Sequence, residues 1–124
     1  MRALVARDLA DAKVEGLSAD RRFATAYNAA LQTANMAIAC AGYRVTAKTG
    51  HHKITFYSAT LALGAGSETF ADYFESCRRK RNVIDYTRSH VATETEANEI
   101  VAQTTEFCEF VERWIDSKHP ASSR

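Results

Sequence analysis

Apolar residues recur at three- and four-residue intervals through most of the chain. That spacing places side chains on one face of an α-helix, so it predicts amphipathic helices rather than strands. The longest such stripe follows Thr95 and consists of Ala97, Ile100, Val101, Thr104, Phe107, Cys108, Val111, Trp114 and Ile115. Just before it, Thr93 and Glu96 have the spacing of a capping box, in which two side chains each satisfy the other residue's backbone N–H. We therefore expect a long helix at this end of the chain.

A second stripe lies within residues 19–41 and ends before Gly42, a residue that suits the position after a helix. Its members are Phe23, Tyr27, Ala30, Leu31, Ala34, Ala37, Ile38 and Ala41. Because so many of these side chains are small, we expect a neighbouring helix to approach closely. A third stripe follows Ser67, a candidate N-cap, and consists of Phe70, Tyr73, Phe74, Cys77, Arg81 and Ile84.

Two shorter helices are indicated by weaker patterns. Leu4, Val5, Leu9 and Ala12 predict an opening helix that ends near Gly16. Ile54, Tyr57, Ser58 and Leu61 predict the inner face of a helix that ends at Gly64. Together the stripes predict an all-α, up-and-down bundle of about four to five helices. We expect one helical domain over residues 1–118, followed by a polar tail over residues 119–124.

Composition and net charge exclude several classes of function. The formal net charge of +1 excludes overall basicity as a route to nucleic acid, so any such binding must come from local clusters. No apolar run approaches the roughly 18 residues that a membrane-spanning helix needs, and we expect a cytoplasmic protein without membrane contact. Cys40, Cys77 and Cys108 lie far apart on the predicted apolar faces, which favours small apolar core residues.

The segment RRKRNVIDY, residues 78–86, is the strongest local cluster of positive charge. Arg81 falls on an otherwise apolar stripe, whereas Arg78, Arg79 and Lys80 are expected to form an expendable rim. On a helix, Asp85 shares a face with Arg81, and Tyr86 shares a neighbouring strip with Asn82. One interpretation is structural: cations in the last turn complement the helix dipole, and a carboxylate holds Arg81. The other is a ligand or active site at Arg81 and Asn82.

A second basic segment contains Arg44, His51 and His52. The adjacent histidines either contact phosphate or supply a base, or they belong to an ordinary loop that leads into a helix. No carboxylate or cysteine is spaced with them as a metal site requires, so we expect no metal and no other cofactor. If both basic segments face one end of the bundle, they form a positive patch for RNA or a nucleotide phosphate.

Three segments together resemble the HEPN superfamily (higher eukaryotes and prokaryotes nucleotide-binding), in its small single-domain bacterial form. They are RRFATAYNAALQTANMAIACAGYRV at residues 21–45, GHH at residues 50–52 and RKRN at residues 79–82. The resemblance extends over residues 18–115. It implies a helical bundle that usually dimerises, with two Arg-containing helices around a shared cleft. It also implies partners, because some members are encoded beside nucleotidyltransferases and others act in toxin–antitoxin or phage-defence pairs.

Many members of this superfamily are metal-independent endoribonucleases. Their motif is Arg, a polar residue that is often Asn, and then His after about four to six intervening positions; Arg stabilises phosphate charge and His moves the proton of the attacking 2′-hydroxyl. Arg81 and Asn82 match this motif, but Tyr86, Thr87 and Arg88 occupy the positions of the histidine. A tyrosine with an ordinary pKa of about 10 is a poor general base at neutral pH.

Three functions follow from these observations. The first is a non-catalytic HEPN-like protein that binds RNA, a nucleotide or a partner protein within a toxin–antitoxin or defence-type system. The second is an endoribonuclease that uses Arg81 and Asn82 with an atypical proton carrier, such as Tyr86 or a loop histidine. The third is a structural helical dimer whose cationic segment only caps a helix. A homodimer and an antitoxin or nucleotidyltransferase-type partner are expected with the first.

Overall fold

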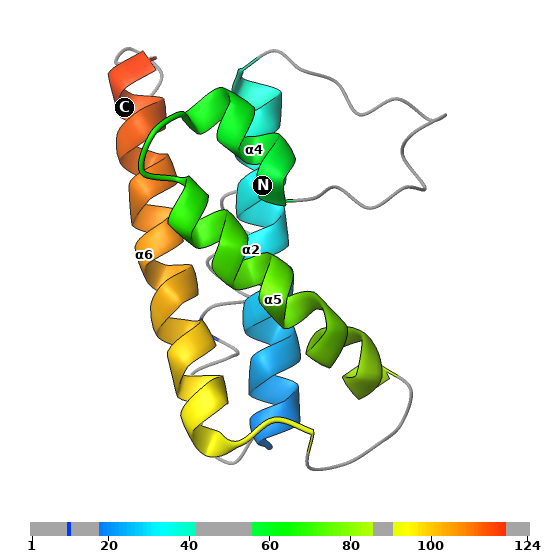
Figure 1. The fold of residues 1–124 in the computed structure, drawn as a ribbon. Coiled ribbons are helices and arrows are strands. Elements are labelled where there is room, and N and C mark those ends of the chain that lie inside the picture. The colour runs from blue at the N-terminus through cyan, green and yellow to red at the C-terminus, as the bar shows by residue number, and fades with distance from the viewer. Residues whose placement is uncertain (1–9, 11–17, 42–55, 86–90, 119–124) are drawn as a thin grey trace.

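The computed structural model describes residue 10 and residues 18–41, 56–85 and 91–118, in which the backbone is helical apart from caps and short turns (Figure 1). The described part of the chain contains no strand. The predicted all-α bundle is therefore confirmed. The predicted opening helix lies outside the described residues except for residue 10, which is helical, and Gly42 lies outside them too. The helices are α2 (Ala19–Cys40), α4 (Phe56–Leu63), α5 (Glu68–Asp85) and α6 (Glu94–Lys118).

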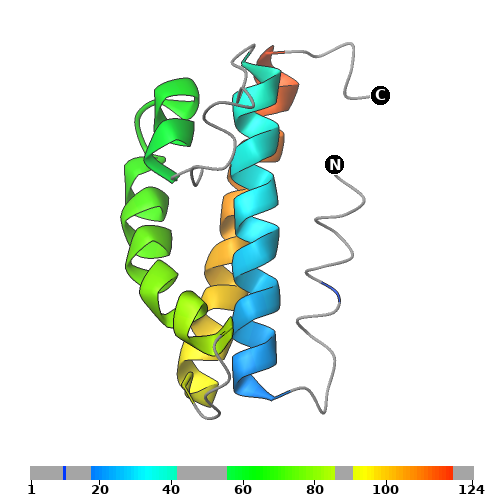
Figure 2. The ribbon, with the colours of Figure 1, turned by 90° about the vertical axis from the view of Figure 1, so that its right-hand side faces the viewer.

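Helix α2 occupies the centre of the bundle and contacts α4, α5 and α6. In Figures 1 and 2, α4 and α5 form a layer across one side of α2, and α6 runs beside α2 in the same direction. Because α2 has neighbours on several sides, its buried face is wider than the predicted stripe. Ala26, Ala29, Thr33 and Met36 are also buried, whereas Ala41 lies beyond the helix end and is exposed.

The predicted close approach to α2 is confirmed by a hydrogen bond that reaches its backbone. The Thr104 hydroxyl of α6 donates to the Ala26 carbonyl oxygen at 3.3 Å. One more contact joins the same two helices, between Thr33 Oγ1 and Cys108 Sγ at 3.1 Å. The buried face of α2 is rich in alanine, and these small side chains let the helix backbones come together.

The core of the bundle is a cluster of aromatic rings. Phe56, Phe74 and Phe107 come from α4, α5 and α6, and all three are fully buried. The ring centroid of Phe74 lies 4.9 Å from that of Phe56 and 5.5 Å from that of Phe107. Aromatic rings contribute large apolar areas and favourable ring–ring contacts, so this cluster holds three helices together.

Helix α4 exists and ends at Gly64 as predicted, but the prediction of its inner face was wrong. Phe56, Ala59 and Leu63 are buried, whereas Tyr57 is 49% exposed and Leu61 is 79% exposed. Ser58 is exposed too, and Ile54 lies outside the described residues. In a helix this short, two stripes with the same spacing compete. The one that brings Phe56 to the aromatic cluster buries the larger apolar area.

Helix α5 begins directly after Ser67, as predicted, and continues to Asp85. Ser67 is buried, and its hydroxyl donates to the Gly64 carbonyl oxygen at 2.6 Å. Gly64 has a φ of 78°, a conformation that glycine adopts without strain. This turn reverses the chain between α4 and α5.

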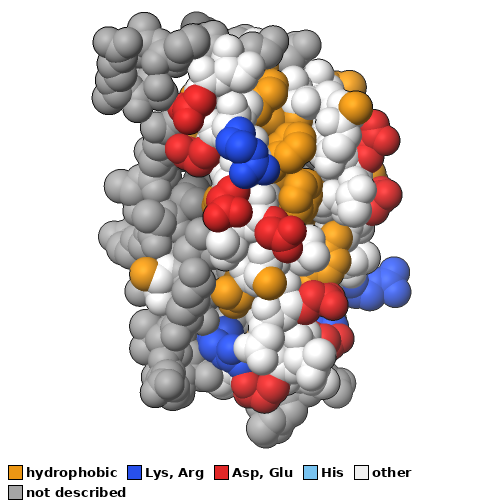
Figure 3. Space-filling view, turned by 90° about the vertical axis from the view of Figure 1, so that its left-hand side faces the viewer, with side chains coloured by type: hydrophobic (Ala, Val, Ile, Leu, Met, Phe, Trp, Pro, Cys, Tyr) orange, Lys and Arg blue, Asp and Glu red, His pale blue; other side chains and the backbone are white. Residues whose placement is uncertain are grey.

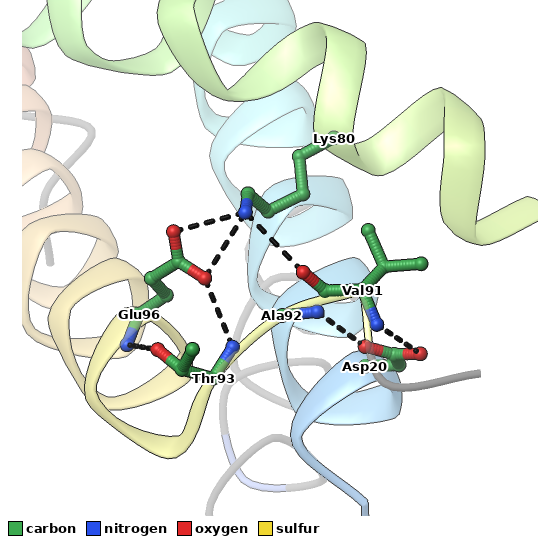
Figure 4. Close-up of polar contacts among 6 residues, drawn as sticks. All are labelled: Asp20, Lys80, Val91, Ala92, Thr93 and Glu96. Carbon is green, nitrogen blue, oxygen red and sulfur yellow. Dashed lines mark hydrogen bonds and ion pairs between the residues drawn. The ribbon is translucent and has the colours of Figure 1, made fainter. Parts of the chain in front are cut away.

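The predicted capping box at the start of α6 is confirmed (Figure 4). Thr93 N–H donates to Glu96 Oε1 at 2.9 Å, and Glu96 N–H donates to Thr93 Oγ1 at 3.0 Å. Lys80 Nζ of α5 lies 2.9 Å from Glu96 Oε2, and the Asp20 carboxylate of α2 accepts a hydrogen bond from Ala92 N–H at 2.6 Å. The start of α6 and the residues just before it are thus tied to both neighbouring helices.

The cysteines belong to the helix packing, as predicted. Cys77 is buried, Cys40 and Cys108 are half-buried, and none of the three forms a disulfide. Burial raises the pKa of the Cys77 thiol, so this side chain stays protonated at neutral pH. No helix in the described ranges combines the length and apolar character needed to cross a bilayer.

Candidate functional site

The four consecutive cations of residues 78–81 point to different parts of the molecule, because successive helical residues are about 100° apart. Arg78 lies 3.4 Å from Glu75 Oε1 on the same helix, and Arg79 is exposed. Lys80 pairs with Glu96 of α6, so its assignment to an expendable rim was wrong. Arg81 Nη2 donates to Asn28 Oδ1 of α2 at 3.1 Å. The four cations therefore differ in their surroundings.

The interpretation of these cations as a helix cap is wrong. Helix α5 continues to Asp85, and its last turn contains no basic residue. The effect of the helix dipole is confined to the last turn, which Arg81 precedes. The inward placement of Arg81 is confirmed instead: it is half-buried, lies on the same face as Phe74 and Cys77, and reaches α2.

Arg78 and Arg81 are one helical turn apart and face two consecutive residues of α2, Tyr27 and Asn28. The positive charge of Arg78 lies close enough to the Tyr27 hydroxyl to favour its ionised form, and Arg81 hydrogen bonds to the Asn28 amide oxygen. Burial raises the pKa of Tyr27, and the nearby Arg78 only partly offsets this effect. The Tyr27 hydroxyl is therefore a protonated hydrogen-bonding group at neutral pH and does not act as a base.

Glu75 positions Arg78 and joins the same region to α4. Its Oε2 accepts a hydrogen bond from the Phe56 backbone N–H at 2.9 Å, while its Oε1 faces Arg78. A carboxylate at the first residue of α4 also complements the positive end of that helix. Glu75 thus fixes the start of α4 against α5 and holds the Arg78 side chain toward α2.

Asn82 is exposed on α5, next to Arg81 and one turn after Arg78. We call Tyr27, Asn28, Arg78, Arg81 and Asn82 the α2–α5 polar face. Its chemistry combines two guanidinium groups with two amides and a phenol, which suits a ligand rich in phosphate and hydrogen-bonding groups.

The remaining predicted site residues cannot be placed on this face. Tyr86, Arg44, His51 and His52 lie outside the described residues, as does the side chain of Asp85. The predicted Arg81–Asp85 and Asn82–Tyr86 pairs therefore stay predictions. The described ranges contain no group of three or more His, Cys, Asp or Glu side chains that could hold a metal ion.

Sequence reasoning missed three residues of this region. Tyr27 was assigned only to the core, and Asn28 and Glu75 were not singled out. A signal was present for two of them, because Tyr27 and Asn28 belong to AYNAAL, one of the segments that carry the family resemblance. Glu75 gave no such signal, since its role depends on Phe56, which is distant along the chain.

Comparison with known families decides the identity of this fold. A family model described as HEPN_SAV_6107-like HEPN matches residues 14–112. The chain belongs to the HEPN superfamily. The HEPN match spans α2, α4 and α5 and most of α6, so it includes both sides of the α2–α5 polar face. No curated protein and no solved structure gave a significant match.

Proposed function

We propose that this HEPN protein binds RNA through phosphate contacts at the α2–α5 polar face and does not cleave it. The observation that carries this proposal is the hydrogen bond from Arg81 to Asn28, 53 residues away along the chain. It places the Arg of the family motif on the face shared with α2, one turn from Arg78, rather than at the helix terminus. The same geometry supports phosphate binding better than helix capping.

Arginine suits this task because its planar guanidinium matches the oxygens of a phosphate and keeps its charge at any physiological pH. At a half-buried position the charge is also screened less by salt than on an open surface. Asn82, exposed beside Arg81, provides an amide donor and acceptor for a base edge or a 2′-hydroxyl.

The side of the molecule on which α6 lies disfavours phosphate. Figure 3 views the side on which α6 lies, and acidic side chains are spread over it. The exposed carboxylates of this helix include those of Glu94, Glu99, Glu106, Glu109 and Asp116. Repulsion by these groups directs an RNA strand away from α6, toward the side that carries the α5 arginines.

The absence of cleavage follows from the proton carriers that the motif offers. In the family the Arg-Asn pair is followed by a histidine, and Tyr86 stands at that position. The tyrosine on the described face, Tyr27, has a raised pKa. Neither phenol accepts a proton from a 2′-hydroxyl at neutral pH. We place the protein as the binding component of a toxin–antitoxin or defence-type pair, as a homodimer with an antitoxin or nucleotidyltransferase-type partner.

Fluorescence anisotropy with a labelled single-stranded RNA in EDTA tests the binding. Arg81→Ala should weaken the affinity by about tenfold. It should also reduce the slope of log Kd against log salt concentration by about one, because one phosphate contact is lost. Arg79→Ala is the matched control, because it removes the same charge from an exposed position of the same helix. It should change the affinity by about twofold or less. Equal effects of the two variants, or no binding by the wild type, would contradict the proposal.

The same mixtures, resolved on a denaturing gel, test cleavage. The wild type should leave the RNA intact, and Tyr86→His should introduce metal-independent cleavage that Arg81→Ala abolishes again. Cleavage by the wild type that disappears in Arg81→Ala would instead establish the endoribonuclease alternative. A thermal melt of each variant separates lost binding from lost folding.

A further inference from the structure

The most exposed large apolar side chains of the described residues lie on the outer face of α4. Leu61 is 79% exposed and Tyr57 is 49% exposed, whereas Val83 of α5 is 36% exposed. Leu61 follows Tyr57 by one helical turn, so the two side chains share a face. In Figure 2 the layer of α4 and α5 forms the left-hand edge of the described helices, and its outer side faces away from α2. Apolar side chains grouped on an outer face with polar residues around them are typical of an interaction surface.

Carboxylates border these apolar side chains. The Tyr57 hydroxyl donates to Asp72 Oδ1 of α5 at 2.7 Å. Because the chain reverses direction between α4 and α5, the next turn of α4, with Leu61, lies toward the preceding turn of α5, with Glu68. Residues 56–77 contain no lysine or arginine, so this surface is purely acidic. We call the four exposed residues Tyr57, Leu61, Glu68 and Asp72 the acid-bordered patch.

We propose that the acid-bordered patch is the docking surface for an amphipathic helix of a partner protein. Apolar residues of that helix would cover Leu61 and Tyr57, and its lysine or arginine residues would face Glu68 and Asp72. The apolar pair and the acidic pair of the patch each repeat after four residues. A helix presents side chains of one face at the same interval, so it can contact both pairs along its length.

The contact between Tyr57 and Asp72 prepares the patch for a cationic partner. It raises the pKa of Tyr57, so the phenol keeps its proton and the hydrogen bond persists at neutral pH. A ring held in this way loses less freedom when a partner binds. A lysine or arginine that pairs with Asp72 also lies close to the Tyr57 ring, where a cation is attracted to the aromatic face.

Other occupants fit the acid-bordered patch less well. An RNA strand would meet the carboxylates of Glu68 and Asp72, which repel phosphate. A lipid surface would have to remove water from the same carboxylates. A second copy of this chain, paired through the patch about a two-fold axis, would bring the same acidic surface against itself. A basic partner helix has none of these costs.

The patch rests on the proposed function only for the expectation of a partner protein, to which it adds a surface and a charge. Arg81 follows Asp72 by nine residues, which is about 180° round the helix, and it faces α2. The acid-bordered patch and the α2–α5 polar face therefore lie on opposite sides of α5. RNA and the partner can bind at the same time, and the patch stays open when the Arg-containing faces of two copies meet.

Two designed peptides test the chemistry of the occupant, with fluorescence anisotropy of the labelled peptide as the readout. Each has about 18 residues, long enough to form a helix, and the same row of leucines on one face. Lysines flank the leucines in one peptide, and glutamates replace every lysine in the other. The full chain should bind the lysine peptide at least about tenfold more tightly at low salt, and added salt should reduce this difference.

Variants of the full chain test the location. Leu61→Ser should weaken binding of the lysine peptide by about tenfold, and Asp72→Asn should weaken it by about threefold or more. Val83→Ser and Glu109→Gln are the matched controls, because they remove an exposed apolar side chain and an exposed carboxylate outside the patch. Each control should change the affinity by about twofold or less. Circular dichroism melts confirm that each variant is folded.

Three results would overturn the patch: no binding of the lysine peptide, equal binding of the two peptides, or equal effects of the variants and their controls. A change of oligomeric state in Leu61→Ser, measured by sedimentation velocity, would overturn it too, because a second copy would then occupy the surface.

The patch and the proposed RNA binding can fail separately. Arg81→Ala should impair RNA binding and leave peptide binding unchanged, whereas Leu61→Ser should do the reverse. A wild type that binds RNA but not the lysine peptide would overturn only the patch. A wild type that binds the lysine peptide but not RNA would overturn only the proposed RNA binding.

Discussion

Neighbouring residues with the same charge have different tasks in this molecule. Lys80 holds the start of α6 through Glu96 and the Val91 carbonyl oxygen, whereas Arg81 reaches α2. Periodicity predicted that Arg81 lies on the inner face, because that property depends on spacing along one helix. The partners could not be predicted in the same way. Asn28 and Glu96 are distant in sequence, and only the packing of the helices brings them close.

The contribution of Glu96 to the stability of the fold can be tested through its dependence on pH. The backbone N–H of Thr93, and next Lys80, lower the pKa of this carboxylate. A carboxylate with a lowered pKa stabilises the fold above its ordinary pKa and loses that effect as pH falls through the lowered value. We expect the wild type to exceed Glu96→Gln in free energy of unfolding by about 0.5 kcal/mol at neutral pH. The difference should vanish at acidic pH.

Urea unfolding at a series of pH values measures this difference. Glu109→Gln is the control, because Glu109 is exposed on the same helix, and this substitution should have a small effect throughout. A Glu96→Gln difference that stays constant down to acidic pH would show that the charge of Glu96 contributes nothing.

At the scale of an element, length decides how well the sequence predicts a buried face. Helices α2 and α6 extend over many turns, so one stripe accumulates more matches than any rival, and the predicted stripe positions are buried or half-buried except Ala41. Helix α4 is the counterexample. Its eight residues offer two stripes of equal quality, Tyr57 with Leu61 and Phe56 with Leu63. The choice between them depends on aromatic partners in α5 and α6, which the local pattern does not contain.

Substitution of two leucines in α4 tests which face of this helix is buried. Leu63→Ala should lower the free energy of unfolding by about 2–4 kcal/mol, because a buried leucine leaves a cavity. Leu61→Ala removes the same atoms from an exposed position and should change it by about 0.5 kcal/mol or less. Chemical denaturation of dilute protein measures both. A larger loss for Leu61→Ala would restore the face predicted from the sequence.

For the whole molecule, the fold class followed from the sequence but the arrangement did not. A nearly continuous helical period and a single proline near the end of the chain are sufficient to predict an all-α bundle. The central place of α2 depends on which apolar faces of the helices pack together. The α2–α5 polar face depends on the same packing. The family motif located Arg81 and Asn82, whereas the role of Glu75 became visible only once the helices were packed.

Phe74 tests whether the aromatic cluster unites the bundle. It is fully buried, and its ring meets those of Phe56, Phe107 and Tyr73. Phe74→Ala should lower the free energy of unfolding by about 3–5 kcal/mol while the transition stays cooperative. Phe110→Ala, at a half-buried position, should cost less. Urea titrations followed by circular dichroism and by tryptophan fluorescence should give coincident curves; separate transitions would show that α6 folds on its own.

The side-by-side packing of α2 and α6 also bears on how the protein is made. Contacts between them join residues more than 70 positions apart, such as Ala26 with Thr104 and Thr33 with Cys108. During synthesis α2 leaves the ribosome before the other described helices and has no α6 to pack against until α4 and α5 have followed. Its alanine-rich apolar face is exposed over that interval. Folding of this bundle therefore cannot be completed before α6 has emerged, and a chaperone that shields α2 would have its greatest effect just before that point.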